Sequence, residues 1–229
     1  MTLQVNDLDR REVTHIASSF GDAPSELPNA YRKSGKRVID VALVVVSLPI
    51  VLPLIALLAM IVALDGSNPF FIQNRVGRNG RVFRIFKLRT MIPNAKAHLE
   101  DFLSKDSGAR AEWEANQKLR NDPRVTSLGR FLRNSSLDEL PQLINVLKGD
   151  MSLIGPRPMM IEQMPIYPGR AYYDLRPGIS GPWQVSDRNG TTFAARAKFD
   201  TDYYRELSLW VDIKILLRTF GAVVRRTGC

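Results

Sequence analysis

The uncharged stretch from Val41 to Leu64 constrains this chain more than any other feature, and Ser47 is its only hydroxyl residue. About 20 apolar residues in a helix, at about 1.5 Å each, cross the roughly 30 Å of hydrocarbon in a bilayer. A buried core helix is the alternative, but a run that is apolar on all sides exceeds what a chain of 229 residues can cover. We therefore expect a membrane segment over residues 35–65, after a disordered polar tail over residues 1–34.

Prolines and flanking charges predict the path of this segment. Pro49 and Pro53 lie near its middle, where each removes a backbone hydrogen bond and clashes with the preceding turn. Basic residues flank both ends, at positions 32–37 and 75–89, and such flanks prefer the cytoplasmic side. A re-entrant helix that breaks at one of the two prolines and leaves on the side it entered satisfies both flanks. A kinked helix that spans the bilayer is the alternative.

Composition narrows the class of partner. The net charge of +9 predicts an anionic partner, which leaves nucleic acid, an anionic membrane surface or a phosphorylated substrate. Cys229 is the single cysteine, so no disulfide forms within the chain and a reducing compartment is expected.

A hairpin follows the apolar segment. Phe70–Val76 and Val82–Arg89 have the composition of strands, and the turn between them contains Asn79-Gly80, a strong local hairpin signal. Its arginines form either a solvated face or, beside a membrane segment, a contact with lipid headgroups or phosphate.

The remaining segments predict a helix-rich α+β domain over residues 66–229. A polar surface helix is expected from Asn94 to about Leu119, and a Gly- and Pro-rich loop from Arg176 to Gly190 carries Gln184 and Arg188. Residues Leu207–Val224 predict an amphipathic helix, for which core packing is the default and membrane-interface binding the competitor.

An acidic pair, Asp138-Glu139, is the candidate for chemistry. Ser136 and Glu139 match a helix capping box, although Pro141 fits the first helical turn better if Asp138 is the N-cap. Such a terminus would keep the carboxylates ionised and attract phosphate. Two neighbouring acids can also divide labour, one as a nucleophile toward phosphorus and one as a ligand for Mg²⁺. The residues alone leave the cap and the catalytic pair equally open.

Seven ordered motifs between Lys36 and Gly228 resemble the bacterial sugar transferases, the monotopic polyprenyl-phosphate phosphoglycosyl transferases. The motifs are Lys36–Asp40, Phe86–Met91, Ser136–Gln142, Gly149–Ser152, Gly155–Pro158, Arg176–Gly178 and Trp210–Lys214. The resemblance implies transfer of a sugar 1-phosphate from a UDP-sugar to undecaprenyl phosphate with release of UMP, which is the first membrane step of exopolysaccharide repeat-unit synthesis. The short length resembles members that start with galactose or glucose.

The resemblance also implies roles for individual residues. Asp138 would be the nucleophile that forms a covalent phospho-sugar intermediate, and Glu139 would bind Mg²⁺. The substrate-binding residues would be Lys87, Arg157, Arg176, Gln184, Arg188 and Asp200. The pattern has glycine where this chain has Asp187, and its bend proline aligns with Pro53, so that Pro49 is additional.

The expected setting is the cytoplasmic face of a bacterial inner membrane, with amphipathic interfacial helices around the active site, no nucleic-acid partner and a possible homodimer. Two competing hypotheses remain. One is a membrane-anchored module that binds anionic lipid or nucleic acid without catalysis. The other is a membrane phosphatase or nucleotidase that shares the acidic pair.

Overall fold

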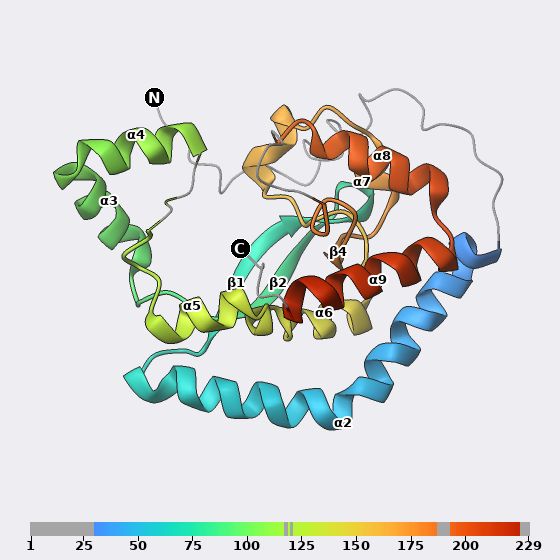
Figure 1. Ribbon diagram of the computed structural model, residues 1–229, viewed down its shortest axis with the longest axis horizontal. Coiled ribbons are helices and arrows are strands. Elements are labelled where there is room, and N and C mark those ends of the chain that lie inside the picture. Colours follow the sequence, from blue (N-terminus) through green and yellow to red (C-terminus); the bar gives the residue numbers. More distant parts are fainter. Residues whose placement is uncertain (1–29, 117–118, 120, 187–192, 225–229) are drawn as a thin grey trace.

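The computed structural model describes residues 30–116, 119, 121–186 and 193–224, and it has the expected helix-rich α+β class (Figure 1). Most of the predicted tail lies outside these residues, but the chain is already helical at Tyr31, four residues before the predicted boundary. In chain order, the elements that carry the argument are the helical turn η2 (Tyr31–Gly35), α2 (Lys36–Val62), η3 (Ala63–Asp65), β1 (Phe70–Val76), η4 (Arg78–Gly80), β2 (Val82–Leu88), α3 (Ala95–Lys105), α4 (Ser107–Asn116), α5 (Ser127–Asn134), η5 (Leu137–Glu139), α6 (Gln142–Lys148), β3 (Ser152–Ile154), η6 (Ile161–Ile166), α7 (Ala171–Asp174), β4 (Gly178–Ser180), α8 (Arg196–Glu206) and α9 (Leu209–Val224).

Helix α2 bends without interruption. The chain stays helical through Pro49 and Pro53, so the expected break is a bend, which Figure 1 shows near the middle of the helix. In the turn before the first proline, the Ser47 hydroxyl donates to the Val44 carbonyl at 2.8 Å, as polar side chains do where proline disturbs a helix. The stretch Tyr31–Asp65 is the one helical segment of the described chain that is long and apolar enough to cross a membrane, and only 11% of its most apolar window is buried.

Both ends of α2 are bound to the same body of the protein. Near its start, the Arg37 guanidinium donates to the Val146 and Leu147 carbonyls at the end of α6, and Asp40 accepts a 2.6 Å hydrogen bond from the Ser152 hydroxyl. Lys36 forms a 2.6 Å ion pair with Asp212 of α9. These contacts join residues more than 100 positions apart in the sequence.

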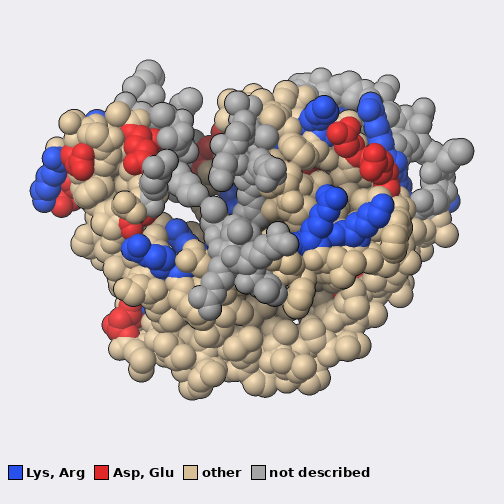
Figure 2. All heavy atoms as spheres, in the orientation of Figure 1, with Lys and Arg blue, Asp and Glu red and all other residues tan. Residues whose placement is uncertain are grey.

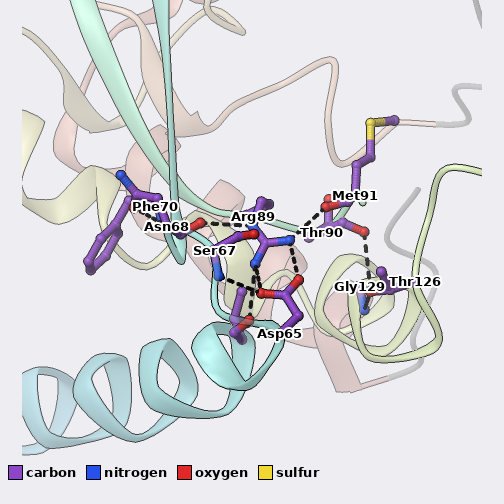
Figure 3. A network of polar contacts seen from close by, with 10 residues as sticks. Asp65, Ser67, Asn68, Phe70, Arg89, Thr90, Met91, Thr126 and Gly129 are labelled. Carbon is purple, nitrogen blue, oxygen red and sulfur yellow. Dashed lines mark hydrogen bonds and ion pairs between the residues drawn. The ribbon is translucent and has the colours of Figure 1, made fainter. Parts of the chain in front are cut away.

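Arg89 holds the other end of α2 (Figure 3). Its guanidinium pairs with both Asp65 carboxylate oxygens at 2.7 Å and donates to the carbonyls of Val62, Asn68 and Met91. Arg89 was part of the basic flank that we expected to face lipid headgroups or phosphate. Instead, the Arg89 guanidinium donates to protein acceptors, including a carbonyl at the helix end that would otherwise lack a donor.

The close approach of α5 to Thr90, also seen in Figure 3, requires a glycine. Thr126 caps α5, because its hydroxyl accepts from the Gly129 amide at 2.8 Å. A β-carbon at Gly129 would overlap the Thr90 carbonyl, so α5 can lie this close to the end of β2 only with glycine there.

The hairpin agrees with its prediction. Strands β1 and β2 pair antiparallel with Val76 opposite Val82, and Asn79 and Gly80 both have positive φ in the turn. Hydrophobic residues of β2 pack against α2, α5 and α6 in two clusters around Leu88 and Ile85. The hairpin therefore lies between the apolar helix and the loops that follow it.

Three elements differ from the predictions. The polar helix expected from Asn94 to Leu119 is two helices, because Asp106 is extended and its carboxylate accepts from the Ala109 amide at the start of α4. The loop from Arg176 to Gly190 contains β4, which pairs in parallel with the equally short β3. Helix α9 does not bury its apolar stripe, since Trp210, Leu217 and Phe220 are 62–71% exposed.

Candidate active site

The acidic pair lies in a short helical turn rather than at a helix terminus. Leu137–Glu139 form the single turn η5, and α6 begins three residues later at Gln142. Ser136, with φ of 56°, makes no capping hydrogen bond through its side chain. Neither version of the predicted helix cap is therefore present, so helix capping does not explain the pair.

Strand β2 supplies the partner of the pair. The Lys87 ammonium lies 2.7 Å from a Glu139 carboxylate oxygen, and both side chains are about one-fifth exposed. These residues are 52 positions apart in the sequence, so the hairpin and the turn η5 meet at this ion pair. The structure thus brings together Lys87 and Glu139, both predicted site residues.

Asp138 is more enclosed than Glu139. Its side chain is buried, and burial is the main reason why its pKa rises to about 6. The Lys87 and Arg133 charges oppose this increase, and the Glu139 charge adds to it. The expected helix terminus is absent at the pair, and burial disfavours the ionised form of Asp138 instead of favouring it. At neutral pH the carboxylate still predominates, with higher basicity than an ordinary aspartate and little hydration.

A cationic cleft opens beside the pair. Its lining consists of Arg75, Ile85, Lys87, Glu139, Gln142, Arg157, Pro158 and Ile179. Three of these side chains are cationic and one is anionic, so the cleft favours an anion. Its volume is about 40 Å³, comparable with one or two water molecules, so a large ligand would lie across it with only a small group inside. A larger hollow of about 570 Å³ lies between α3 and α4 and contains none of the predicted site residues.

Two loops that cross at glycines position Arg157. The Gly155 amide donates to the Ser180 carbonyl and the Gly178 amide donates to the Pro156 carbonyl, each within 2.9 Å. A β-carbon on Gly155 would meet the Arg176 carbonyl, which explains why this motif needs glycine. The Arg157 carbonyl accepts from Arg196 at 2.7 Å, and the Trp183 ring lies 5.9 Å from the Arg157 guanidinium and 5.1 Å from that of Arg196.

The other predicted site residues do not line the cleft. Asp200 is 1% exposed and accepts a 2.6 Å hydrogen bond from the Tyr167 hydroxyl, and burial raises its pKa to about 6. Arg176 donates to the Gly149 carbonyl at 3.0 Å, and Gln184 is buried in the loop that follows β4. Arg188 lies outside the described residues.

Sequence reasoning missed Arg75, Arg133 and Arg196 as individual site residues. Arg133 donates to the Thr90 hydroxyl at 2.9 Å, and its charge acts to lower the pKa of Asp138. The alternation of side chains along a strand could have identified Arg75. If the hairpin turn is centred on residue 79, position 71 lies opposite Lys87, and positions 73 and 75 then lie on the same face of the hairpin as Lys87.

The side chains that could act as metal ligands determine how the site would hold a divalent cation. The part of the chain that the structure describes contains no group of three or more His, Cys, Asp or Glu side chains that could hold a metal ion. Mg²⁺ is usually bound by one or two carboxylates together with substrate phosphates. Asp138 and Glu139 provide two adjacent carboxylates next to the cationic cleft, so these residues fit that shared arrangement rather than a preformed cage.

Comparisons with known proteins agree with these observations. The family model described as bacterial sugar transferase matches residues 31–226. The chain is 45% identical over 195 residues to the UDP-galactose-lipid carrier transferase of Erwinia amylovora and 46% identical over 195 residues to the undecaprenyl-phosphate galactose phosphotransferase of Salmonella typhimurium. Each alignment covers 84% of this chain and 41% of the relative, so the chain spans about two-fifths of their length. The exopolysaccharide production protein ExoY of Rhizobium meliloti is 41% identical over 224 residues, which is 95% of this chain and 99% of that protein.

Proposed function

This chain belongs to the bacterial sugar transferase family, and from that premise we propose that it transfers a sugar 1-phosphate from a UDP-sugar to undecaprenyl phosphate, releasing UMP. The transfer would be the first membrane step of exopolysaccharide repeat-unit synthesis, and the relative ExoY, 99% of which this chain covers, is named an exopolysaccharide production protein. The observation that carries the proposal is a buried Asp138 beside the Lys87–Glu139 ion pair, at an arginine-lined cleft.

Two steps account for the transfer. In the first, an Asp138 carboxylate oxygen attacks the phosphorus that bears the sugar. The bridging P–O bond breaks, its electron pair stays on the leaving UMP, and a phospho-sugar ester of Asp138 remains. In the second, a phosphate oxygen of undecaprenyl phosphate attacks the same phosphorus and frees the carboxylate. The product is a diphosphate-linked lipid sugar.

Each cleft residue has a defined task in these steps. Burial raises the basicity of Asp138, which makes its carboxylate a better nucleophile. Arg157 and Lys87 offset the phosphate charge, which would otherwise repel an anionic nucleophile. Glu139, with Asp138 beside it, would hold Mg²⁺, which when bound neutralises phosphate charge. Arg176, Gln184 and Asp200 would then contribute from outside the cleft lining, and Arg188 stays a predicted substrate-binding residue.

The proposed membrane setting follows from the apolar surface. In Figure 2 the bottom of the molecule, which α2 forms, is almost without charged side chains. Lys and Arg side chains lie higher in the view. On α2, Val46 and Ile50 are each 77% exposed, and α9 adds the exposed Trp210 and Phe220. Apolar surface of this extent is stabilised by lipid. We infer a re-entrant α2 in the inner membrane, with both ends and the active site on the cytoplasmic face.

Cysteine labelling tests this topology. Cys229→Ser provides a cysteine-free background, and Lys33→Cys and Arg81→Cys place single thiols at exposed positions before and after α2. We expect a membrane-impermeant thiol reagent to label both positions from the same side of sealed vesicles. Labelling from opposite sides would contradict the re-entrant arrangement.

Enzyme assays with Asp138→Asn test the reaction. Purified protein with undecaprenyl phosphate, Mg²⁺ and a panel of radiolabelled UDP-sugars, beginning with galactose and glucose, should give lipid-soluble label for at least one sugar. Asp138→Asn should reduce that transfer by roughly 10⁴-fold or more, because the carboxamide is not a nucleophile toward phosphorus. Full transfer by Asp138→Asn would refute the nucleophile assignment. Lipid binding without transfer by the native protein would favour the non-catalytic module, and release of free sugar phosphate would favour the phosphatase.

A further inference from the structure

Arg75 occupies an unusual position for a buried cation. It lies on β1, lines the same cleft as Lys87, Glu139 and Arg157, and carries a largely buried guanidinium. One of its terminal nitrogens donates to the Gln73 side-chain oxygen at 2.6 Å, and the other donates to the Pro158 carbonyl at 3.4 Å. Its Nε is buried and has no hydrogen-bond partner. No carboxylate lies within ion-pair distance of Arg75 among the described residues.

The charges nearest to Arg75 make this arrangement unfavourable without a ligand. Burial, above all, together with the charges of Arg157 and Arg196, lowers the pKa of Arg75 to about 10, although Tyr172 and Glu162 act in the opposite direction. Like charges that are withdrawn from water destabilise a protein unless an anion lies between them. Two guanidinium groups that face one cleft match a phosphate, which accepts paired hydrogen bonds from each.

The hairpin register gives the order of groups along the cleft. Phe71 is opposite Lys87, Gln73 is opposite Ile85 and Arg75 is opposite Phe83, and directly opposite residues share a face. Lys87, Ile85 and Arg75 therefore point to the same side, with Lys87 and Arg75 separated by about 13 Å along the strands. The acidic pair is at the Lys87 end, so the attacked phosphorus must lie there. A diphosphate that lies across the mouth of the cleft, with its attacked phosphorus at that end, would place its second phosphate toward Arg75 and Arg157.

We propose that Arg75 and Arg157 together form a clamp for the phosphate that departs with the nucleoside monophosphate. The inference rests on the proposed function and assigns a part of that site. When the bridging P–O bond breaks, its electron pair remains on the oxygen of the leaving phosphate, and the two guanidinium groups stabilise this new charge. Arg75 also fixes its partner, because it donates to the Pro158 carbonyl next to Arg157, while Arg196 holds the Arg157 carbonyl.

The same chemistry would suit the phosphate of the lipid acceptor, so the test separates the two half-reactions. We would compare native protein, Arg75→Gln, Arg75→Lys and the control Arg205→Gln, which removes an exposed arginine on α8. Three quantities are measured: formation of phospho-sugar protein from labelled UDP-sugar without acceptor, inhibition by UMP, and the KM for undecaprenyl phosphate.

We expect Arg75→Gln to slow the first half-reaction on the order of 10²-fold and to weaken UMP inhibition at least about tenfold, with the acceptor KM unchanged. Arg75→Lys should fall between Arg75→Gln and the native protein, because it keeps the charge but not the paired donors. A raised acceptor KM with unchanged UMP inhibition would assign the clamp to the acceptor and overturn the proposal. Arg75→Gln that behaves like Arg205→Gln would also overturn it.

A measurement on the native protein covers the case in which Arg75→Gln does not fold. UMP should protect Arg75 from an arginine-modifying dicarbonyl, as mapped by mass spectrometry, and undecaprenyl phosphate alone should not. Protection only by the lipid would refute the assignment. If the native protein transfers no sugar from any UDP-sugar, the proposed function fails. If it transfers sugar and UMP leaves Arg75 unprotected, only the clamp fails.

Discussion

Arg75 and Arg89 belong to the same hairpin region, yet the protein surrounds them in opposite ways. Arg89 faces the Asp65 carboxylate and three backbone carbonyls, so its charge and its donors are used within the fold (Figure 3). Among the described residues, Arg75 donates to an amide oxygen and, at a longer distance, to one backbone carbonyl, and two other guanidinium groups lower its pKa. The comparison teaches that burial alone does not distinguish a structural arginine from a ligand-binding one. The groups opposite the guanidinium make the distinction.

The largest expected effect on the ligand-binding side comes from Arg157→Gln. It removes one of the guanidinium groups in the cleft, so transfer should fall roughly 10²- to 10³-fold. The thermal midpoint should change little, because Arg157 has no carboxylate partner within ion-pair distance in the described chain. Activity and melting are measured on the same preparation, with Arg205→Gln as control. A large loss of stability with normal activity per folded molecule would show that Arg157 has a structural role, like Arg89.

Arg89→Gln should show the opposite pattern. It removes donors from the Val62, Asn68 and Met91 carbonyls, and at about 1 kcal/mol for each hydrogen bond the protein should lose roughly 3 kcal/mol of stability. Chemical denaturation in detergent measures this loss. Lys105→Gln is the control, because its ion pair with Asp101 is exposed and should change stability by less than about 1 kcal/mol. Intact stability with a large loss of transfer at low temperature would contradict the structural role of Arg89.

Asp200→Asn should give the smallest effect of these three substitutions. It tests whether Arg196 is a structural arginine like Arg89, with a carboxylate partner, or resembles Arg75. Asp200 lies by Arg196, yet burial raises its pKa to about 6. The native state therefore binds more protons than the unfolded state between about pH 4 and 6, so native stability falls as pH rises through that window and is level above it. Asp200→Asn lacks this slope, and the Tyr167 hydroxyl can still donate to the amide oxygen.

The stability of Asp200→Asn relative to the native protein should therefore rise by on the order of 2 kcal/mol between pH 4 and 6. Unfolding of both proteins across this range measures the difference. A difference that falls with pH would mean that Arg196 stabilises the ionised carboxylate, as Asp65 and Arg89 stabilise each other.

Local patterns in the sequence predicted the hairpin, the apolar helix and the acidic pair. Each of these depends on residues close together in the sequence. The hairpin has alternating strands with an Asn-Gly turn, the helix is an uncharged run, and the acidic pair is two adjacent carboxylates within a family motif. The pairing of β3 with β4 could not be predicted in this way, because three residues give no periodic signal and the partners lie 26 positions apart. The stripe on α9 was visible, but periodicity says only which residues share a face and not what covers that face.

The site shows the same limit. Family motifs pointed to Lys87, Asp138 and Arg157 from the sequence, and the structure places Lys87 against Glu139. The raised pKa of Asp138 depends on burial, which no local pattern gives. Arg75 and Arg89 looked alike in the sequence, because the groups that separate their roles come from distant segments, at Asp65 and Pro158.

The ties at the start of α2 have a consequence for synthesis of the protein. Lys36 and Tyr31 contact Asp212, which the ribosome adds 176 and 181 residues later, and at about 5–20 residues per second that delay is roughly ten seconds or more. The apolar helix is thus made first. Arg37 and Asp40 can bind α6 and Ser152 before α9 is made, but the contacts of Lys36 and Tyr31 can form only when α9 has emerged. Until then the Lys36 charge has no Asp212 to pair with. Truncation before α9 would remove both contacts to Asp212 and leave Arg37 and Asp40 as the ties at the start of α2.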